Sequence, residues 1–409
     1  MTINRFLSER RKAQARRALE VVRTDGLPGL KRRAIRDLYG RFGASEPQLS
    51  LLPEDIADST KIELCIPETK VPRDRQLVVG WLTTPPRSGS GGHTTMFRMV
   101  EAVEAAGHRC VLLLSDRHGG EATRHAEIIR RAWPRIRAEV RDVDEGFVGL
   151  DACVATAWQT AHTLAARNDV PLRYLYLVQD FEPFFYPRGL QYALAEDSYR
   201  FGFRCVTIGY MAAELLKSEL DVPAEVAPFG CDTDVYHLIN TSDRSGVVFY
   251  TKPDVERRGY LLGVHALAEF SKRHPEQEIH VFGDAPARLP FPATRHQSLS
   301  PAELNTLYNS TIAGFAFSFT NISLVAEEML ASGTIPVIND SSYARADLHN
   351  PYACWTTPTP AAVADALSAL VESPDISRRA VAASGSVHPD KWTLAQRVFL
   401  RALEEAVYK

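Results

Sequence analysis

Short apolar runs alternate with amphipathic stretches along most of the chain, and this alternation predicts a parallel α/β fold. An apolar run of four to eight residues, bounded by polar or turn residues, is typical of a strand buried on both faces. The first half predicts strands at 77–82, 110–114, 151–156, 174–178 and 204–208. A helix predicted at 94–106 ends at Gly107 and links the first two strands into a βαβ unit.

A polar stretch at 232–245 separates this half from a second one with the same pattern. The second half predicts strands at 246–250, 278–282, 312–317 and 335–338, and helices at 261–273, 301–308, 327–331 and 360–371. A last helix, at 393–406, is placed to cross back to the first half. Two such domains in series form a cleft, and ligands of these folds bind at the carboxyl ends of the strands.

The domain organisation follows from these boundaries. We predict a basic N-terminal extension at 1–75, a Rossmann-like domain at 76–238, a second at 239–385 and a C-terminal helix at 386–409. Of the 409 residues, 45% are hydrophobic and 24% charged, which is typical of a folded globular protein and excludes disordered and collagen-like chains. The net charge of −3 gives no global attraction to nucleic acid.

Two further patterns indicate the cellular compartment of the protein. No stretch approaches the ~18 apolar residues of a spanning helix, and the Arg-rich start lacks a secretory apolar core, so we expect a cytoplasmic protein. The six cysteines are scattered among apolar neighbours without a CxxC pair. We therefore predict buried free thiols, neither disulfides nor a zinc site.

Residues 1–43 form a local basic segment, with twelve Arg and Lys against four acidic residues. Two interpretations fit this segment. It is a solvated basic helix packed on the fold, or a helix whose apolar residues contact an anionic membrane at the inner face of the cell membrane.

A glycine-rich stretch, 85–93, follows the first predicted strand. Gly91 and Gly92 would let backbone amides approach a ligand, and the following helix N-terminus favours negative charge. A plain tight turn is the alternative. His93 would either bind a sugar hydroxyl or cap the helix. The spacing is not GxGxxG and no acidic ribose reader follows, which disfavours a dinucleotide site.

Two carboxylates, Asp180 and Glu182, follow the strand predicted at 174–178. Carboxylates at the end of an apolar strand suit general-base chemistry or binding of sugar hydroxyls, and Pro183 fixes the turn. Asp180 is the better candidate base. A structural or helix-capping aspartate remains the alternative.

The second half carries cations and a helix start suited to a diphosphate. Lys252 follows a predicted strand, and Arg257 precedes the next helix, so the two could clamp a diphosphate; surface solubility is the alternative. Polar residues at 319–324 precede a helix whose amides could receive a phosphate. Glu328, in a small apolar context, could accept two ribose hydroxyls.

These motifs, in this order, resemble those of a GT-B glycosyltransferase of family 4. The resemblance rests on the Gly91-Gly92-His93 stretch, on Lys252 with Arg257, and on the run from Glu328 to Gly333. Residues 179–187 and 320–324 with Glu328 resemble, more narrowly, the WsaF-type rhamnosyltransferases. The resemblance covers about residues 76–400.

The resemblance implies metal-independent transfer of L-rhamnose from dTDP-L-rhamnose to a growing cell-surface polysaccharide or lipid-linked glycan, without a cofactor. In the second domain, Lys252 and Arg257 would meet the diphosphate, Glu328 the ribose and Gly283 the nucleobase. Phosphate and sugar would meet Thr320, Asn321, Ile322, Ser323 and Leu324. The first domain would bind the acceptor, with Asp180 and His93 near the reacting carbon and Gly91, Gly92 and Glu182 on the acceptor side.

The chain departs from the broader family at two places. Thr320 stands where the family has the first of two glutamates, the one that contacts the donor sugar. A less polar contact there would suit the 6-deoxy carbon of rhamnose. The turn Gly333-Thr334-Ile335-Pro336 is one residue longer than usual, so a slip of one residue would make Glu327 the ribose ligand.

Other functions remain open. The donor could be a UDP- or GDP-sugar, since no linear motif reports the base. A non-catalytic nucleotide-sugar-binding protein is kept open by Thr320. An NAD-dependent dehydrogenase requires a GxGxxG turn and an acidic ribose reader, and the sequence has neither.

Overall fold

The computed structural model describes residues 51–86, 89–116, 122–284, 288–296 and 299–409, and the chain divides into two compact units. The first runs to Val206 and adds Val222–Ala224 and Phe399–Lys409; the second takes Thr207–Asp221 and Glu225–Val398. The basic segment 1–43 lies outside the described residues. Residues 51–75 belong to the first unit, where Asp55 bonds Arg167 at 2.8 Å.

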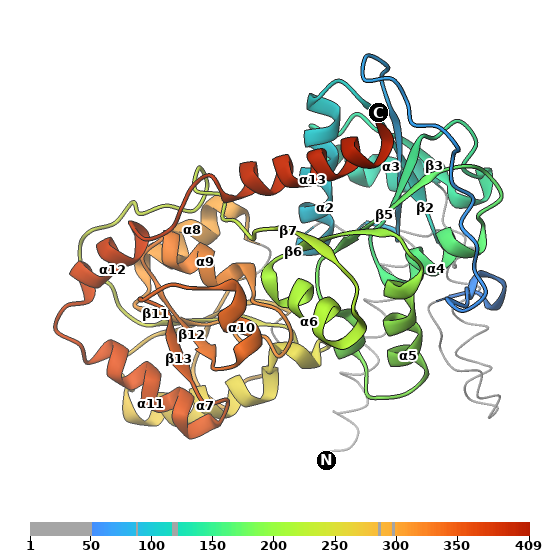
Figure 1. The fold of residues 1–409 in the computed structure, drawn as a ribbon. Helices are drawn as coiled ribbons and strands as arrows, with labels where there is room; N and C mark the ends of the chain where they lie inside the picture. The colour runs from blue at the N-terminus through green and yellow to red at the C-terminus, as the bar shows by residue number, and fades with distance from the viewer. Residues whose placement is uncertain (1–50, 87–88, 117–121, 285–287, 297–298) are drawn as a thin grey trace. The chain divides into compact units, whose positions relative to one another are not determined.

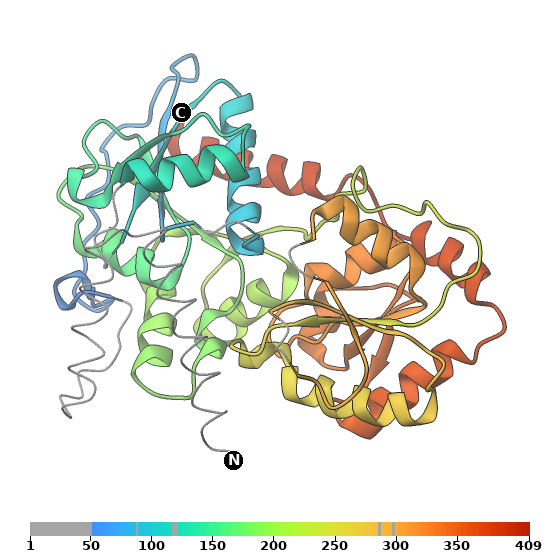
Figure 2. The same ribbon diagram turned by 180° about the vertical axis from the view of Figure 1, so that it is seen from behind.

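The first sheet has seven strands in the order β3-β2-β1-β4-β5-β6-β7 (Figure 1). They are β1 Val78–Thr83, β2 Arg109–Leu114, β3 Glu139–Asp142, β4 Ala152–Ala155, β5 Arg173–Val178, β6 Arg204–Ile208 and β7 Ala224–Ala227. The α-helices between them are α2 Gly91–Ala105, α3 Ala122–Ala132, α4 Trp158–Ala166, α5 Leu190–Asp197 and α6 Tyr210–Leu220. Figure 2 shows α2 and α3, coloured cyan and teal, on one face of this sheet.

The second sheet has six parallel strands in the order β10-β9-β8-β11-β12-β13. They are β8 Val247–Thr251, β9 Ile279–Gly283, β10 Thr294–Arg295, β11 Ala313–Phe315, β12 Ile335–Asn339 and β13 Cys354–Thr356. The helices are α7 Tyr260–Arg273, α8 Pro301–Ser310, α9 Leu324–Ala331, α10 Ser342–Asp347, α11 Pro360–Val371 and α12 Ile376–Ser384. Helices α7 and α11 pack side by side (Figures 1 and 2).

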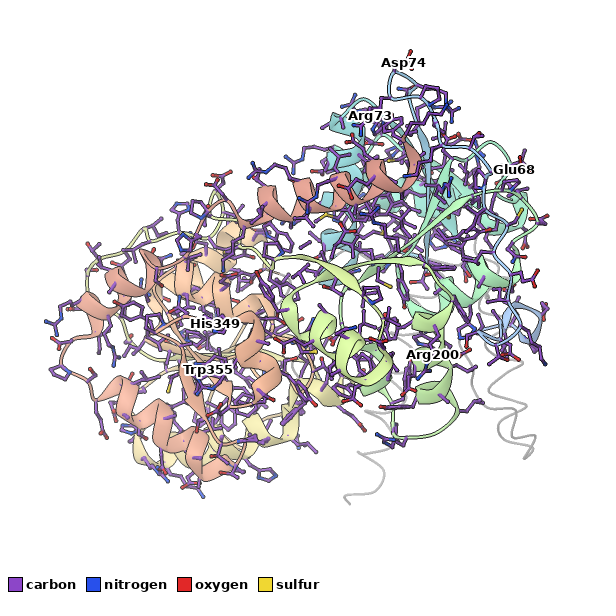
Figure 3. All side chains as sticks on the ribbon, in the orientation of Figure 1. Glu68, Arg73, Asp74, Arg200, His349 and Trp355 are labelled. Atoms are coloured by element: carbon purple, nitrogen blue, oxygen red, sulfur yellow. The ribbon has the colours of Figure 1, made fainter. Side chains whose placement is uncertain are left out.

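Short 3-10 helices complete the units: η1 Pro53–Asp55, η2 Val143–Glu145, η3 Glu182–Phe185, η4 Ser198–Arg200 and η5 Glu256–Arg258. The final helix, α13 Lys391–Val407, corresponds to the helix predicted at 393–406. Its Phe399 stacks on Trp81 of β1 with ring centroids 5.0 Å apart. Arg73, labelled in Figure 3, donates to the Lys409 carbonyl at 3.0 Å and helps to hold the C-terminus.

The predicted fold class is confirmed: both units are parallel α/β sheets with helices. All nine predicted strands are present, whereas β3, β7, β10 and β13 were not predicted. The six cysteines, all within the described residues, form no disulfide; four are buried, but Cys65 and Cys354 are partly exposed, contrary to the prediction for those two. None of the helices in the described part of the chain is long and apolar enough to cross a membrane.

Arg244 organises the core of the second unit. Its guanidinium is buried and donates to the carbonyls of Tyr308, Thr311 and Ser332 at 2.9, 3.1 and 2.7 Å. Tyr308 lies in the last turn of α8, and Ser332 is the C-cap of α9, so the cation meets the negative ends of two helices. Burial lowers the pKa of Arg244 to about 10, which leaves it protonated at neutral pH.

We expect Arg244→Met to lower the free energy of unfolding by about 3 kcal/mol, because several buried carbonyls lose their donor at once. Arg244→Lys should be almost as costly, since one ammonium group cannot reach both helix ends. Scanning calorimetry of the full chain measures the effect.

Arg378→Met is the matched control, because that side chain is 79% exposed and forms an ion pair with Asp375 at the surface. The free energy of unfolding of this control should change by no more than about 0.5 kcal/mol. An Arg244→Met variant as stable as this control would show that the buried cation does not hold the helix ends.

Candidate functional site

Most of the residues predicted for the donor gather at one edge of the second sheet. The strand order reverses between β8 and β11, and parallel α/β sheets bind ligands outside the carboxyl ends of their strands at such a reversal. Lys252 follows β8 directly, and residues 316–323 lead from β11 into α9. Gly283 ends β9, which pairs with β8.

Lys252 is held by its neighbours at this edge. Its Nζ lies 2.8 Å from Oδ2 of Asp284 and 5.7 Å from the centre of the Tyr250 ring. Burial pulls the pKa of Lys252 down, but the bond to Asp284, with the Tyr250 contribution, outweighs this effect and raises the pKa above 10.5. Lys252 is therefore a stable cation throughout the neutral range.

The two loops of the predicted diphosphate site are joined directly. Arg257 lies in η5, after β8, and its carbonyl accepts a hydrogen bond from the Phe319 N–H at 2.9 Å. Gly259 follows with φ +60°, and a Cβ there would lie 3.1 Å from the Phe319 ring. The loop after β8 and the loop after β11 thus form one connected structure.

Gly283 has φ +94° at the end of β9. A Cβ on it would lie 2.5 Å from the Thr251 carbonyl oxygen, so only glycine fits this close pairing with β8. The same turn places the Asp284 N–H 3.0 Å from the Thr251 carbonyl, which sets Asp284 beside Lys252.

The segment 320–324 leads into α9. Thr320, Ile322 and Ser323 are buried, Asn321 and Leu324 are half-buried, and Ser323 is the N-cap residue. The two glutamates of α9 differ in environment. Glu327 is buried and pairs with Lys391 of α13, whereas Glu328 is half-buried.

In the first unit, Gly91, Gly92 and His93 form the first turn of α2, not a loop as predicted. Ser90 caps this helix, accepting from the His93 N–H at 3.4 Å. The His93 ring lies 2.8 Å from Ser90 Oγ through Nδ1 and 3.2 Å from the Thr84 carbonyl through Nε2. His93 therefore ties the helix start to the chain leaving β1, while the N-cap itself is Ser90.

Asp180 and Glu182 follow β5, near the start of α2. A Cβ on Gly92 would lie 3.6 Å from Oε1 of Gln179, so the two segments are neighbours. Asp180 is buried, and its Oδ1 accepts from the Phe181 N–H at 2.9 Å. The buried Tyr199 hydroxyl locks the turn, accepting from the Glu182 N–H at 3.0 Å and donating to the Asp180 carbonyl at 3.2 Å.

Glu182 has a structural role in addition to the predicted one. Its Oε2 accepts from the N–H of Trp158, the first residue of α4, at 2.5 Å and from the Tyr176 hydroxyl at 3.2 Å. A carboxylate at a helix N-terminus is stabilised by the exposed amides and the helix dipole. Burial, followed by the charge of Glu182, raises the pKa of Tyr176 well above 10, so this hydroxyl remains a donor.

Asp284 and Lys391, which hold Lys252 and Glu327, were not predicted from the sequence. Asp284 directly follows Gly283, so it could have been predicted as part of the same motif. Lys391 is remote in sequence from α9, and no linear pattern links the two. Among the described residues, no group of three or more His, Cys, Asp and Glu side chains is arranged to hold a metal ion.

Comparison with known proteins gives two family matches. The WsaF C-terminal domain model matches residues 245–368, which hold the donor-side candidates. The WsaF N-terminal domain model matches residues 146–210, which hold Asp180 and Glu182.

A relative, the O-antigen biosynthesis protein RfbC of Myxococcus xanthus, is 30% identical over 291 residues. The match covers 66% of this chain and 22% of RfbC, so the chain spans about a fifth of that protein's length.

Solved structures share the fold at low sequence identity. HepE of Anabaena, in complex with UDP and glucose, is 13% identical with a TM-score of 0.60, covering 81% of this chain and 99% of HepE. WaaG, a glycosyltransferase involved in lipopolysaccharide biosynthesis, is 13% identical with a TM-score of 0.58, covering 79% and 98%. The two WsaF domain models match in chain order, and HepE and WaaG share the two-domain fold, so the chain is similar to the WsaF-like GT-B glycosyltransferases.

Proposed function

We propose that the protein is a glycosyltransferase of polysaccharide or O-antigen biosynthesis that binds a nucleoside diphosphate sugar at the carboxyl edge of its second sheet. The observation that carries this proposal is the position of Lys252 and of the loop before α9, on the two strands where the sheet order reverses. The RfbC and WaaG names, which refer to O-antigen and lipopolysaccharide biosynthesis, support the pathway.

Lys252 and Arg257 bind the diphosphate in this proposal. When the donor enters, a phosphate oxygen replaces or joins Asp284 as the partner of Lys252, which stays protonated. The leaving diphosphate gains charge in the transition state, and a fixed cation stabilises that charge without reorganisation. Amides near Asn321, at the start of α9, add donors of the same kind.

Glu328 is the ribose ligand. Glu327, the alternative left by the longer turn, is buried and paired with Lys391, whereas Glu328 is half-buried. In this proposal Gly283, at the end of β9, lies next to the nucleobase.

The donor we propose is dTDP-L-rhamnose. Thr320, in place of a carboxylate, gives a less polar contact that suits the 6-deoxy carbon. A UDP- or GDP-sugar is the second candidate, and the UDP bound to HepE favours UDP among these. Cytoplasmic location, membrane contact through residues 1–43 and independence of metal remain predictions from the sequence.

Asp180 acts on the acceptor if the transfer inverts the anomeric carbon. Its carboxylate takes the proton of the acceptor hydroxyl while that oxygen bonds to the anomeric carbon, and the nucleoside diphosphate leaves with the bonding electrons. Glu182 accepts from the Trp158 N–H at the start of α4, so we assign proton transfer to Asp180, whose Oδ1 also accepts from the Phe181 N–H.

Thermal-shift titration with dTDP, UDP, GDP and NAD tests donor binding. Nucleotide at a hundredfold excess over Kd adds about 2.7 kcal/mol to stability, so the ligand that binds raises the midpoint. We expect dTDP to give the largest shift, and Lys252→Ala to weaken binding at least about tenfold through loss of a charged contact.

Lys272→Ala, at an exposed position late in α7, controls for the loss of a positive charge and should bind as wild type. A selective response to UDP or GDP would replace the donor and keep the transferase. A response to NAD alone, or to no nucleotide, would contradict the proposal.

Release of free nucleoside diphosphate in the presence of donor and acceptor tests Asp180. Asp180→Asn should lower the transfer rate by about 10²- to 10⁴-fold while nucleotide affinity stays unchanged, because only the base is lost. Asp169→Asn, at an exposed position of the same unit, should keep the wild-type rate. A loss of only severalfold would rule out Asp180 as the base.

A further inference from the structure

A single buried side chain at the end of β12 holds the loop that leaves β11. Asn339, the last residue of β12, accepts from the Ser318 N–H at 2.9 Å and donates from Nδ2 to the Ser318 carbonyl at 2.8 Å. Asn339 is 2% exposed and Ser318 is fully buried. Both backbone groups of Ser318 are therefore bonded to one amide side chain.

This contact extends the pairing of the two strands beyond the end of β11. The last register pair of β11 and β12 joins Phe315 to Val337, and the Ala316 N–H then donates to the Val337 carbonyl at 3.0 Å. Two residues beyond this pair on each strand, the Asn339 side-chain amide takes the place of a backbone partner and bonds the N–H and the carbonyl of Ser318. The loop stays attached to β12 while its backbone turns toward α9.

The residues after Ser318 are those of the donor loop. The Phe319 N–H donates to the Arg257 carbonyl at 2.9 Å, and Thr320 is 1% exposed. The chain is thus fixed on one side by Asn339 and on the other by η5 before it reaches residues 320–324. A displaced Ser318 would move both the Arg257 contact and the start of α9.

We propose that Asn339 is a positioning residue of the donor site. Asn339 fixes the backbone of Ser318, and this in turn positions the following residues, which receive phosphate and sugar. The inference rests on the proposed function, because it assigns Asn339 a part in the same donor site. Since Asn339 is buried, it acts through the loop and not by contact with the ligand.

Full-length Asn339→Ala tests this inference with dTDP and UDP as probes. We expect affinity for the nucleotide that binds wild type to fall at least about tenfold, because the loop is no longer preorganised. Amide hydrogen exchange at Phe319 and Thr320 should accelerate. Asn309→Ala is the matched control, because Asn309 is also 2% exposed and bonds backbone groups of His237, Ile239, Asn240 and Asn305. It should lower the thermal midpoint without changing nucleotide affinity.

Asn339→Asp separates positioning from a general loss of packing. An ionised carboxylate still accepts from Ser318 but repels its carbonyl oxygen, whereas the protonated acid offers an O–H donor in place of the amide. Burial favours the protonated form. The affinity of Asn339→Asp relative to wild type should therefore recover as the pH falls from about 7.5 to 5.5, while the relative affinity of Asn339→Ala stays constant.

The outcomes distinguish a failure of the role of Asn339 from a failure of the proposed function. Tight nucleotide binding by wild type together with unchanged binding by Asn339→Ala would overturn the role of Asn339 and leave the proposed function intact. Equal losses in Asn339→Ala and Asn309→Ala would reduce the effect to stability and also overturn it. Absence of nucleotide binding by wild type would overturn the proposed function and this inference with it.

Discussion

The second unit depends on one buried cation surrounded by neutral oxygen atoms. The Arg244 guanidinium joins the end of α8, the end of α9 and the segment at Asn240, all through carbonyl acceptors. A buried charge without such bonds would cost several kcal/mol, so the carbonyls must stay where they are for the cation to be tolerated. This mutual requirement fixes the direction of α9. The N-terminus of α9, at Ser323, then lies at the edge of the sheet where Lys252 leaves β8.

The glycine that closes the Glu328 to Gly333 run is explained by the same cation. Gly333 has φ +83°, and a Cβ on it would lie 2.6 Å from the Arg244 guanidinium. The N–H groups of Gly333 and Thr334 bond the Leu330 and Met329 carbonyls, the pattern of a Schellman C-cap. The residue that lengthens the turn, Thr334, donates its hydroxyl to the Tyr308 carbonyl. The longer turn therefore contributes to the packing of α8 on α9.

The sequence predicts what burial on both faces imposes and misses what tertiary contacts impose. Every predicted strand is central in its sheet, and each missed strand, β3, β7, β10 and β13, is an edge. Edge strands have one neighbour and less burial, so they lack the continuous apolar run that marks a central parallel strand. Lys252 and Gly283 could be predicted because they directly follow or end such runs. Asn339 and Lys391 could not, because their partners lie 21 and 64 residues away and no local pattern encodes the pairing.

The two groups of candidate residues are built on different physical principles, and this difference bears on what each can do. On the donor side, Phe319 and Ser318 are held through backbone groups. On the first sheet, the side chains themselves hold the structure: Glu182 caps α4 and His93 ties α2 to the end of β1. A carboxylate that caps a helix cannot also take a proton without weakening that helix. In the proposed mechanism proton transfer is assigned to Asp180, whose Oδ1 accepts from the Phe181 N–H and whose backbone carbonyl accepts from the Tyr199 hydroxyl that locks the turn.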